Sequence, residues 1–142
     1  LLRLAGIYGP GRNQLAQLRA GTAKRLVKPG QVFNRIHVDD VAAAIAACLS
    51  GGTDGGSLIL ADDEPAPPQD VVAYAAGLMG IEAPPEIAFD AAALSPMAAS
   101  FYDECKRAAN ARLRALIGPL AFPTYREGLA ALWAAGEGRA RA

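Results

Sequence analysis

The sequence predicts an α/β fold, with helices packed on a parallel sheet, from three observations. Its 142 residues are 52% hydrophobic but only 6% aromatic, which favours helices packed against another layer over a sandwich of aromatic-rich strands. A helix pattern, a glycine-rich connection and an apolar strand pattern follow one another over residues 38–61, an order typical of α/β proteins. The opening apolar run ends in a turn-rich stretch at residues 6–11, and such exits line ligand sites at the carboxyl ends of parallel strands. An all-α fold is the alternative that composition alone allows.

Length, charge and cysteine content narrow the classes of function. A chain of this length can bury one hydrophobic core. Its 14 basic and 14 acidic residues balance, so we expect no binding to nucleic acid or to an anionic membrane. No apolar run approaches the roughly 20 residues that span a bilayer, and the first residues lack the pattern of a signal peptide. Cys48 and Cys105 have no CxxC spacing, so we interpret both as small buried residues and expect a cytoplasmic protein.

Local signals place the elements of the first 61 residues. Residues 1–5 are predicted to form an apolar strand and residues 6–11 the loop after it. Residues 13–20 form a helix with Asn13 as its N-cap, followed by extended pieces at 25–27 and 31–33. The clearest helix pattern begins within residues 33–50, with Asp39 or Asp40 as its N-cap. Its apolar residues at helical spacing are Val41, Ile45, Cys48 and Leu49. Residues 57–61 form the next strand.

The second half of the chain reads mainly as helices. Prolines at 65–68 launch a helix that ends at Gly80 and buries Val71, Ala75 and Leu78. Residues 83–85 are a break, and residues 90–104 a helix interrupted at Ser95-Pro96. Asn110 caps a helix that carries Leu113, Leu116 and Ile117. After an extended stretch at 121–123, a last helix covers 124–134 with Leu129, Leu132 and Trp133 inward.

Three stretches together carry a resemblance to a known family. They are LRLAGIYGPGRN at residues 2–13, FNRIHVDDVAAAIAACL at 33–49 and NARLRALIGPLAFPTYREGLAAL at 110–132. Their order and spacing resemble the second half of extended short-chain dehydrogenases/reductases, the NAD-dependent epimerase/dehydratase family. The resemblance implies the C-terminal part of a Rossmann-type, doubly wound fold plus the smaller substrate-binding lobe, over residues 1–135, with a frayed tail at 136–142. It further implies that the cofactor-binding glycine turn and the catalytic Tyr-x-x-x-Lys pair of such enzymes would precede Leu1.

The same resemblance implies where a cofactor would bind. In such enzymes the backbone after the opening strand meets the carboxamide of the nicotinamide ring of NAD or NADP. The residues at that place here are Ala5, Gly6 and Ile7, and glycine allows a close approach. A tight turn with no ligand is the alternative.

Four polar residues are predicted to bind a small-molecule substrate. Arg12 and Asn13 come just beyond the loop, and Arg35 and His37 alternate along one extended stretch and so share a face. A guanidinium can bind a carboxylate or phosphate through two hydrogen bonds. The alternatives are solvated surface for Arg12 and a structural hydrogen bond at a helix entrance for His37. Phe33 stands four residues before His37, where resembling nucleotide-sugar enzymes often carry arginine, which disfavours a nucleotide-sugar substrate.

Four patterns imitate sites without meeting their requirements. Tyr102 and Lys106 have the Tyr-x-x-x-Lys spacing. In the family, however, the catalytic pair precedes the strand that leads into Tyr-Gly-Pro, here residues 8–10, whereas Tyr102 comes long after it. The glycines of residues 6–11 do not follow G-x-G-x-x-G. The neighbours Asp39 and Asp40 point apart on a helix, and residues 62–64 read as a loop. We therefore predict no catalytic residue and no metal site within this sequence.

These observations lead to one interpretation and one alternative. The chain is interpreted as the C-terminal half of an NAD(P)-dependent oxidoreductase, epimerase or dehydratase, inactive alone. A non-catalytic ligand-sensing or protein-interaction module on the same scaffold is the alternative. Because a parallel strand is normally covered on both edges, we also expect residues 1–5 to cause marginal stability or the formation of a homo-oligomer that covers this edge.

Overall fold

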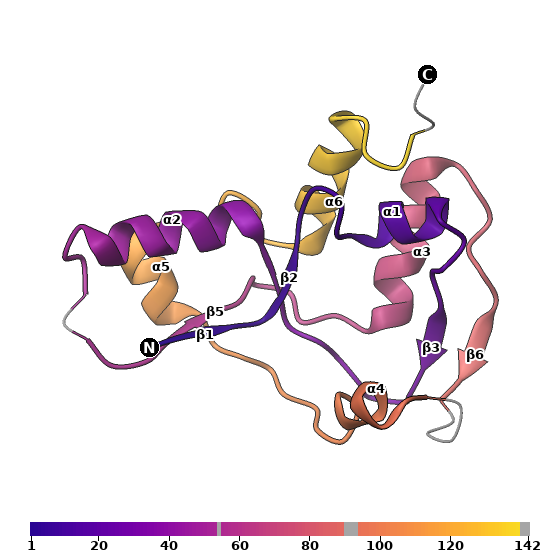
Figure 1. Ribbon diagram of the computed structural model, residues 1–142, viewed down its shortest axis with the longest axis horizontal. Helices are drawn as coiled ribbons and strands as arrows, with labels where there is room; N and C mark the ends of the chain where they lie inside the picture. The colour runs from indigo at the N-terminus through magenta and orange to yellow at the C-terminus, as the bar shows by residue number, and fades with distance from the viewer. Residues whose placement is uncertain (54, 90–93, 140–142) are drawn as a thin grey trace.

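The fold is built from three pairs of parallel strands that are joined and covered by helices (Figure 1). The computed structural model describes residues 1–53, 55–89 and 94–139. In chain order, the elements are β1 (Leu2–Leu4), β2 (Gly6–Tyr8), α1 (Gln14–Arg19), β3 (Arg25–Val27), β4 (Arg35–His37), α2 (Val38–Leu49), β5 (Leu58–Leu60), α3 (Pro68–Met79), β6 (Glu86–Ala88), α4 (Pro96–Ser100), α5 (Ala111–Ile117) and α6 (Tyr125–Ala134). The predicted α/β class with parallel strands is confirmed.

The three strand pairs join segments that are far apart in the sequence. β1 pairs with β5, β2 with β4, and β3 with β6. The first two pairs are continuous along one chain, because the Ala5 N–H donates to the carbonyl of Leu60 (2.9 Å) and the Gly6 N–H to that of Asn34 (3.1 Å). The residues that follow the carboxyl end of β1 are therefore held between two neighbouring strand pairs.

Two segments differ from their predictions because strand pairing decides their conformation. Residues 6–8, predicted as the start of a loop, form β2, in which Gly6 lies opposite Arg35 and Tyr8 opposite His37. The predicted break at 83–85 is followed by β6, whose residues are all exposed. No hydrophobic alternation marks β6, and its pairing with β3 makes it a strand.

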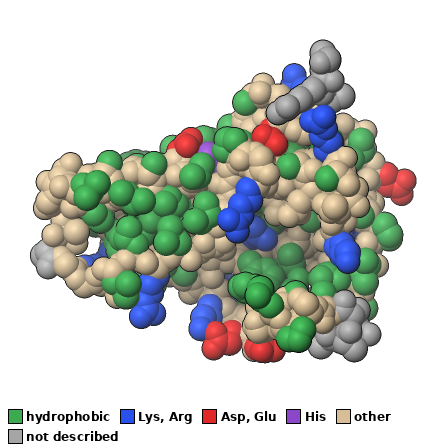
Figure 2. All heavy atoms as spheres, viewed as in Figure 1, with side chains coloured by type: hydrophobic (Ala, Val, Ile, Leu, Met, Phe, Trp, Pro, Cys, Tyr) green, Lys and Arg blue, Asp and Glu red, His purple; other side chains and the backbone are tan. Residues whose placement is uncertain are grey.

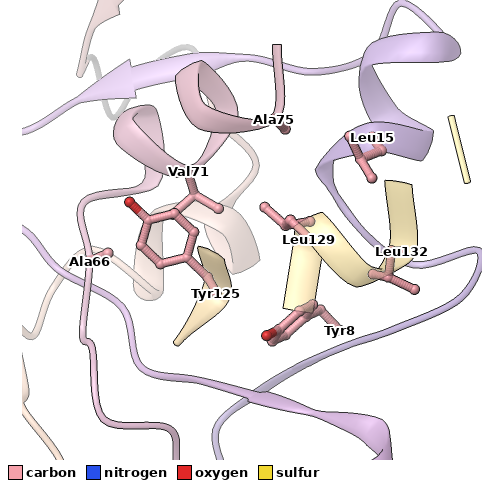
Figure 3. Close-up of a cluster of buried hydrophobic side chains, with 8 residues drawn as sticks. All are labelled: Tyr8, Leu15, Ala66, Val71, Ala75, Tyr125, Leu129 and Leu132. Atoms are coloured by element: carbon pink, nitrogen blue, oxygen red, sulfur yellow. The ribbon is translucent and has the colours of Figure 1, made fainter. Parts of the chain in front are cut away.

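Two clusters of buried side chains form the core. The first joins β2, α1, α3 and α6 and contains Tyr8, Leu15, Ala66, Val71, Ala75, Tyr125, Leu129 and Leu132. Figure 3 shows Tyr8 against the helix that carries Leu129 and Leu132. The second joins β4, α2, β5 and α5 and contains Ile36, Val41, Ala44, Leu58, Leu60, Leu113 and Leu120. The predicted inward positions of α3, α5 and α6 are confirmed at Val71, Ala75, Leu113, Leu129 and Leu132.

Local caps begin and end several of the predicted helices. The Asn13 side chain accepts a hydrogen bond from Ala16 N at the start of α1. α3 ends at Gly80, whose φ of 66° is in the left-handed region that glycine tolerates. Thr124 and Glu127 form a capping box at the start of α6. The predicted cap at Asn13 and the predicted helix end at Gly80 are confirmed, and the capping box, which was not predicted, begins the helix expected over 124–134.

The start of α2 differs from its prediction. The helix begins at Val38, and its N-cap is His37, whose Nδ1 accepts a hydrogen bond from Asp39 N (3.2 Å). The prediction that Asp39 or Asp40 is the cap is wrong, because both lie inside the first turn of the helix. Their negative charges there interact favourably with the positive end of the helix dipole. Asp40 is buried and accepts hydrogen bonds from the backbone N–H groups of Ala121 (2.7 Å) and Phe122 (3.1 Å).

The predicted apolar stripe of α2 is only partly buried. Val41 is in the core, Cys48 is half-buried, and Ile45 and Leu49 are 42% and 84% exposed. Leu1, Leu4 and Val38 are exposed as well, and Figure 2 shows hydrophobic side chains gathered around α2 on the left of the viewed face. α2 therefore presents apolar side chains on two sides, of which only one packs on α5 and the strands.

The helix predicted over 90–104 is short in the part that the structure describes. Residues 90–93 lie outside the described residues, α4 covers only Pro96–Ser100, and residues 104–110 have no regular structure. Cys105 is exposed, so its interpretation as a buried residue is wrong. Of the segment predicted to fray, residues 140–142 lie outside the described residues, whereas Glu137 accepts a hydrogen bond from Gly11 N (3.2 Å). None of the helices in the described ranges is long and apolar enough to cross a membrane.

Candidate functional site

A cavity of about 340 Å³ lies beside β2 and β4, next to α1 and the end of α4. It begins just after the carboxyl end of β1, where Gly6 follows the strand. Its lining residues are Gly6, Ile7, Tyr8, Arg12, Asn13, Gln14, Gln17, Phe33, Asn34, Arg35 and Phe101. Five of the seven residues predicted to bind cofactor or substrate come together here, whereas Ala5 and His37 are not in the lining.

The predicted cofactor residues are arranged along the strand and have different exposure. Gly6 is exposed and Ile7 is half-buried. A Cβ on Gly6 would stand 3.3 Å from the carbonyl oxygen of Asn34, closer than an ordinary van der Waals contact. Ala5 packs against the second core cluster. Of the three predicted cofactor residues, Gly6 and Ile7 therefore line the cavity, and Gly6 is the exposed one.

Arg12 and Asn13 have separate roles at the entrance of α1. Gly9 and Arg12 exchange two backbone hydrogen bonds of 3.1 Å. Asn13 is buried, donates from Nδ2 to the carbonyl of Gly9 (2.8 Å) and accepts at Oδ1 from Ala16 N (2.9 Å). Both ends of the Asn13 amide are thus used in holding the turn. Arg12 is exposed, and within the described residues its guanidinium forms no hydrogen bond or ion pair, so its charge is available to a ligand.

Arg35 is a buried cation in the wall of the cavity. Its Nη1 donates to the carbonyl oxygens of Phe33 (3.0 Å) and Ala66 (3.1 Å), and the residue is 8% exposed. Burial lowers the pKa of its guanidinium, while the nearby Asp62 carboxyl opposes that shift. Burial also raises the pKa of Asp62 to about 7, against the effect of Arg35. The charges of Arg35 and Asp62 therefore influence each other, and the backbone N–H of Asp62 donates to the carbonyl of Arg35 (2.6 Å).

His37 is the last residue of β4 and makes the structural hydrogen bond that is the alternative to substrate binding. The residue is 2% exposed and caps α2 through Nδ1, while its ring contacts Tyr8 edge-on (5.1 Å between centroids) and Phe122 (4.0 Å). Burial lowers its pKa, with Asp39 and Asp40 opposing the shift. His37 is therefore neutral near pH 7 and serves packing and capping.

Tyr102 and Lys106 do not form a catalytic pair. Neither lies on a helix, and Lys106 forms an ion pair with Glu104. The Tyr102 ring packs edge-on against Phe33 (5.2 Å between centroids) and on Phe89 (4.8 Å). Burial raises the pKa of its hydroxyl, whereas proton transfer near neutral pH requires a lowered one.

Six residues of the cavity were missed by the sequence analysis as binding residues. They are Tyr8, Gln14, Gln17, Phe33, Asn34 and Phe101. Tyr8 could have been found from its alternation with Gly6 along a strand. Phe101 gave no such signal, because it reaches the cavity from α4 through long-range packing. Asn34 helps to hold that segment, since it donates to the carbonyl of Lys106 (2.9 Å) and accepts from Ala108 N (2.8 Å).

A metal centre is not assembled in the described parts of the chain. No three histidine, cysteine, aspartate or glutamate side chains of these residues come together in a way that would hold an ion. Asp63 instead binds Asn110 (2.7 Å) and Arg114 (3.0 Å), which fastens the loop after β5 to α5. This loop therefore joins two elements of the fold.

Comparison with solved structures finds the same arrangement in longer proteins. A functionally unknown conserved protein from Silicibacter pomeroyi is 51% identical, with a TM-score of 0.85 over 96% of this chain and 48% of that one. A protein from Methylobacillus flagellatus, classed as an NAD-dependent epimerase/dehydratase, is 28% identical, with a TM-score of 0.64 over 95% and 46% of the two chains. The human epimerase family protein SDR39U1, solved with NADPH, is 20% identical, with a TM-score of 0.75 over 92% and 46%.

The chain thus spans about half the length of the solved structures that it matches. Neither a protein-family model nor a curated protein matches it. The parallel strand pairs, the cavity after β1 and the similar structures agree with the resemblance carried by the sequence. The solved structures that the chain matches include members of the NAD-dependent epimerase/dehydratase family, and the chain is similar to about half of each, consistent with the C-terminal half of an extended short-chain dehydrogenase/reductase.

Proposed function

We propose that this chain supplies the substrate lobe and one wall of the nicotinamide pocket of an NAD(P)-dependent oxidoreductase, epimerase or dehydratase. The observation that carries the proposal is the cavity after β1, where the exposed Gly6 and the half-buried Ile7 line the same recess as the two cations Arg12 and Arg35. Exposed backbone accommodates a flat carboxamide, and guanidinium groups bind anionic substrates. The four groups therefore provide a cofactor side and a substrate side in one recess.

NAD or NADP is the cofactor that fits this proposal. SDR39U1, which shares the fold, was solved with NADPH. When bound, a nicotinamide supplies or accepts hydride. This chain would orient the ring through the backbone of Gly6 and Ile7 and hold the substrate through Arg12. The described residues include no paired tyrosine and lysine, so we expect no turnover by these 142 residues alone.

The exposed apolar side chains around α2 support the proposal that the sheet continues beyond this chain. In the described residues, β1 pairs only with β5, so one of its edges is unpaired. Leu4 on β1 and Ile45 on α2 are large apolar side chains that are 47% and 42% exposed. Parallel sheets are normally covered on both faces. We propose that another polypeptide segment, or a second copy of this chain, covers this face in the active protein.

The cofactor wall can be tested with half of the cofactor. We expect reduced nicotinamide mononucleotide, added to the isotopically labelled chain, to shift the NMR signals of Gly6 and Ile7. Adenosine monophosphate should leave those signals unchanged, because the pocket wall faces the nicotinamide end. Replacing Gly6 by valine should abolish the nicotinamide-dependent shifts, since the new side chain occupies the space before the backbone.

A matched control is Gly77→Val on α3, where an added Cβ meets no atom within 4 Å. This variant should respond to the nicotinamide as the original chain does. If nicotinamide mononucleotide leaves Gly6 and Ile7 unchanged, or shifts the Ile7 signal of Gly6→Val as much as that of the original chain, the chain does not form this wall.

A further inference from the structure

A second recess adjoins the candidate site and shares a wall with it. This recess has a volume of about 210 Å³ and is lined by Val32, Phe33, Asn34, Ser100, Phe101, Glu104 and Lys106. Phe33, Asn34 and Phe101 line both recesses. One ligand can therefore extend from the candidate site into the second recess past two phenyl rings.

Phe33 is a fixed part of this shared wall. Its backbone exchanges two hydrogen bonds with Ala66, of 3.0 and 3.1 Å. Its ring meets Tyr102 edge-on, with 5.2 Å between centroids and 89° between the ring planes. Tyr102 is itself buried and packs on Phe89. Ala66 and Tyr102 thus hold Phe33 in place, so little side-chain ordering is needed when a ligand binds.

Phe101 is the opposite case, an apolar ring without a partner. It follows α4 as its C-cap, is 65% exposed, and packs on no other ring in the part of the chain that the structure describes. Met97, four residues earlier, is 75% exposed. An exposed phenyl ring at the mouth of a cavity gains free energy when an apolar group covers it. α4 therefore brings apolar surface to the junction of the two recesses.

The candidate site also carries positive charge. Arg12 and Arg35 line it, and none of the described residues in its lining is acidic. In the second recess, by contrast, Lys106 is paired with Glu104, so its charges balance. The unpartnered cation, Arg12, thus marks the place for an anionic group, and the phenyl rings mark the place for an apolar one.

We infer that the substrate of this site is a small organic anion with an aromatic group, whose anionic end binds Arg12 and whose ring lies at Phe33 and Phe101. This inference rests on the proposed function, because it assigns the substrate side of the same cavity. A nucleotide sugar, with its polar sugar at the reacting end, does not match two phenyl rings at the shared wall. Ring stacking and a charged hydrogen bond together give the site both its affinity and the orientation of its ligand.

Three related probes separate the two contributions. The labelled chain is titrated with 3-phenylpropionate, with propionate, which lacks the ring, and with 3-phenylpropanol, which lacks the charge. We expect 3-phenylpropionate to shift the NMR signals of Arg12, Phe33 and Phe101 and to bind at least about tenfold more tightly than either of the others, since one buried ring or one charged hydrogen bond is worth roughly that factor.

Two exposed residues provide variants that should fold normally. Phe101→Ser should weaken 3-phenylpropionate about tenfold and leave propionate unchanged. Arg12→Gln should weaken both carboxylates and leave 3-phenylpropanol unchanged. The matched control is Arg19→Gln, because Arg19 is an exposed cation on the same helix as the cavity residues Gln14 and Gln17 and is not in the lining.

The remaining outcomes overturn either the inference or the proposed function. Equal affinity for propionate and 3-phenylpropionate, or an unchanged Phe101→Ser variant, excludes the aromatic part, and an unchanged Arg12→Gln variant excludes the anionic part. If no probe binds while nicotinamide mononucleotide still shifts Gly6 and Ile7, the substrate class is wrong and the proposed function stands. If the probes bind as expected while the nicotinamide does not, the proposed function fails and the aromatic-anion site remains.

Discussion

Replacing Gly128 by alanine tests how closely α6 packs on β2. Gly128 is buried in α6, and a Cβ at this position would stand 2.1 Å from the hydroxyl oxygen of Tyr8 and 2.7 Å from two of its ring carbons. Favourable carbon contacts need about 3.5 to 4.0 Å. The Tyr8 ring cannot move freely, because it is 5% exposed and contacts the His37 ring.

The expected change in the free energy of unfolding follows from two destabilising effects and one stabilising effect. Overpacking of this kind costs about 1 to 3 kcal/mol, and moving the ring also loses the weak hydrogen bond from the Tyr8 hydroxyl to the carbonyl of Thr124 (3.4 Å), worth about 0.5 to 1 kcal/mol. Alanine regains about 1 kcal/mol through its higher helix propensity. We expect a net fall of about 2 kcal/mol in the free energy of unfolding for Gly128→Ala.

Gly77→Ala is the matched control, because it makes the same change in a helix interior where an added Cβ meets no atom within 4 Å. It should raise the free energy of unfolding by up to about 1 kcal/mol. Urea unfolding followed by circular dichroism measures both variants, and the two should differ by about 3 kcal/mol. If Gly128→Ala is as stable as Gly77→Ala, Tyr8 does not pack on α6, and the first core cluster is arranged differently.

Three further predictions concern buried or exposed polar side chains. Burial raises the pKa of Asp62 from 3.8 to about 7, so the folded chain binds one more proton between these values and its free energy of unfolding should fall as pH rises from about 4 to 7; Asp62→Asn should flatten this fall in urea unfolding. Asp40→Ala should lower the free energy of unfolding by about 2 to 3 kcal/mol, because two backbone N–H groups at residues 121–122 lose their acceptor, while Asp39→Ala at an exposed position should change it by well under 1 kcal/mol. Tyr102→Phe should leave the free energy of unfolding unchanged. In mixtures with carbonyl substrates, the absorbance of NADPH should stay constant with the original chain and with this variant alike.

Each of these predictions has an outcome that contradicts it. If the free energy of unfolding of Asp62→Asn still falls as pH rises, other groups cause the pH dependence. His37 contributes the opposite sign, because its lowered pKa makes the free energy of unfolding fall with acidification. Equal effects at Asp39 and Asp40 would show that the charge of the first turn matters more than the two hydrogen bonds. Turnover that Tyr102→Phe abolishes would restore Tyr102 as an acid/base.

The sequence predicts those parts of the fold whose signals lie within a few residues. Asn13 and Thr124 begin helices because their side chains bind N–H groups two or three residues on. Gly80 ends one because it adopts a positive φ. The apolar residues of α3 and α6 recur at helical spacing, so their buried faces could be predicted from the period alone.

Other parts depend on segments that meet only after folding. Ile45 and Leu49 follow the same spacing as Val41, but α2 is apolar on two sides and only the position of α5 and the strands decides which side is buried. β6 has no alternation, and its pairing with β3 makes it a strand. The candidate site divides in the same way, because Gly6, Ile7 and Arg12 adjoin one turn, whereas Phe101 arrives from α4.

The pairing of the strands has a consequence for how the chain acquires its structure. β1 pairs with β5, β2 with β4, and β3 with β6, so none of the three pairs is a hairpin that can form locally. Each pair closes a long loop before its hydrogen bonds form, and a high contact order of this kind slows folding. During synthesis, β2 can therefore pair with β4 only after residues 35–37 have left the ribosome, and β1 with β5 only after residues 58–60 have done so.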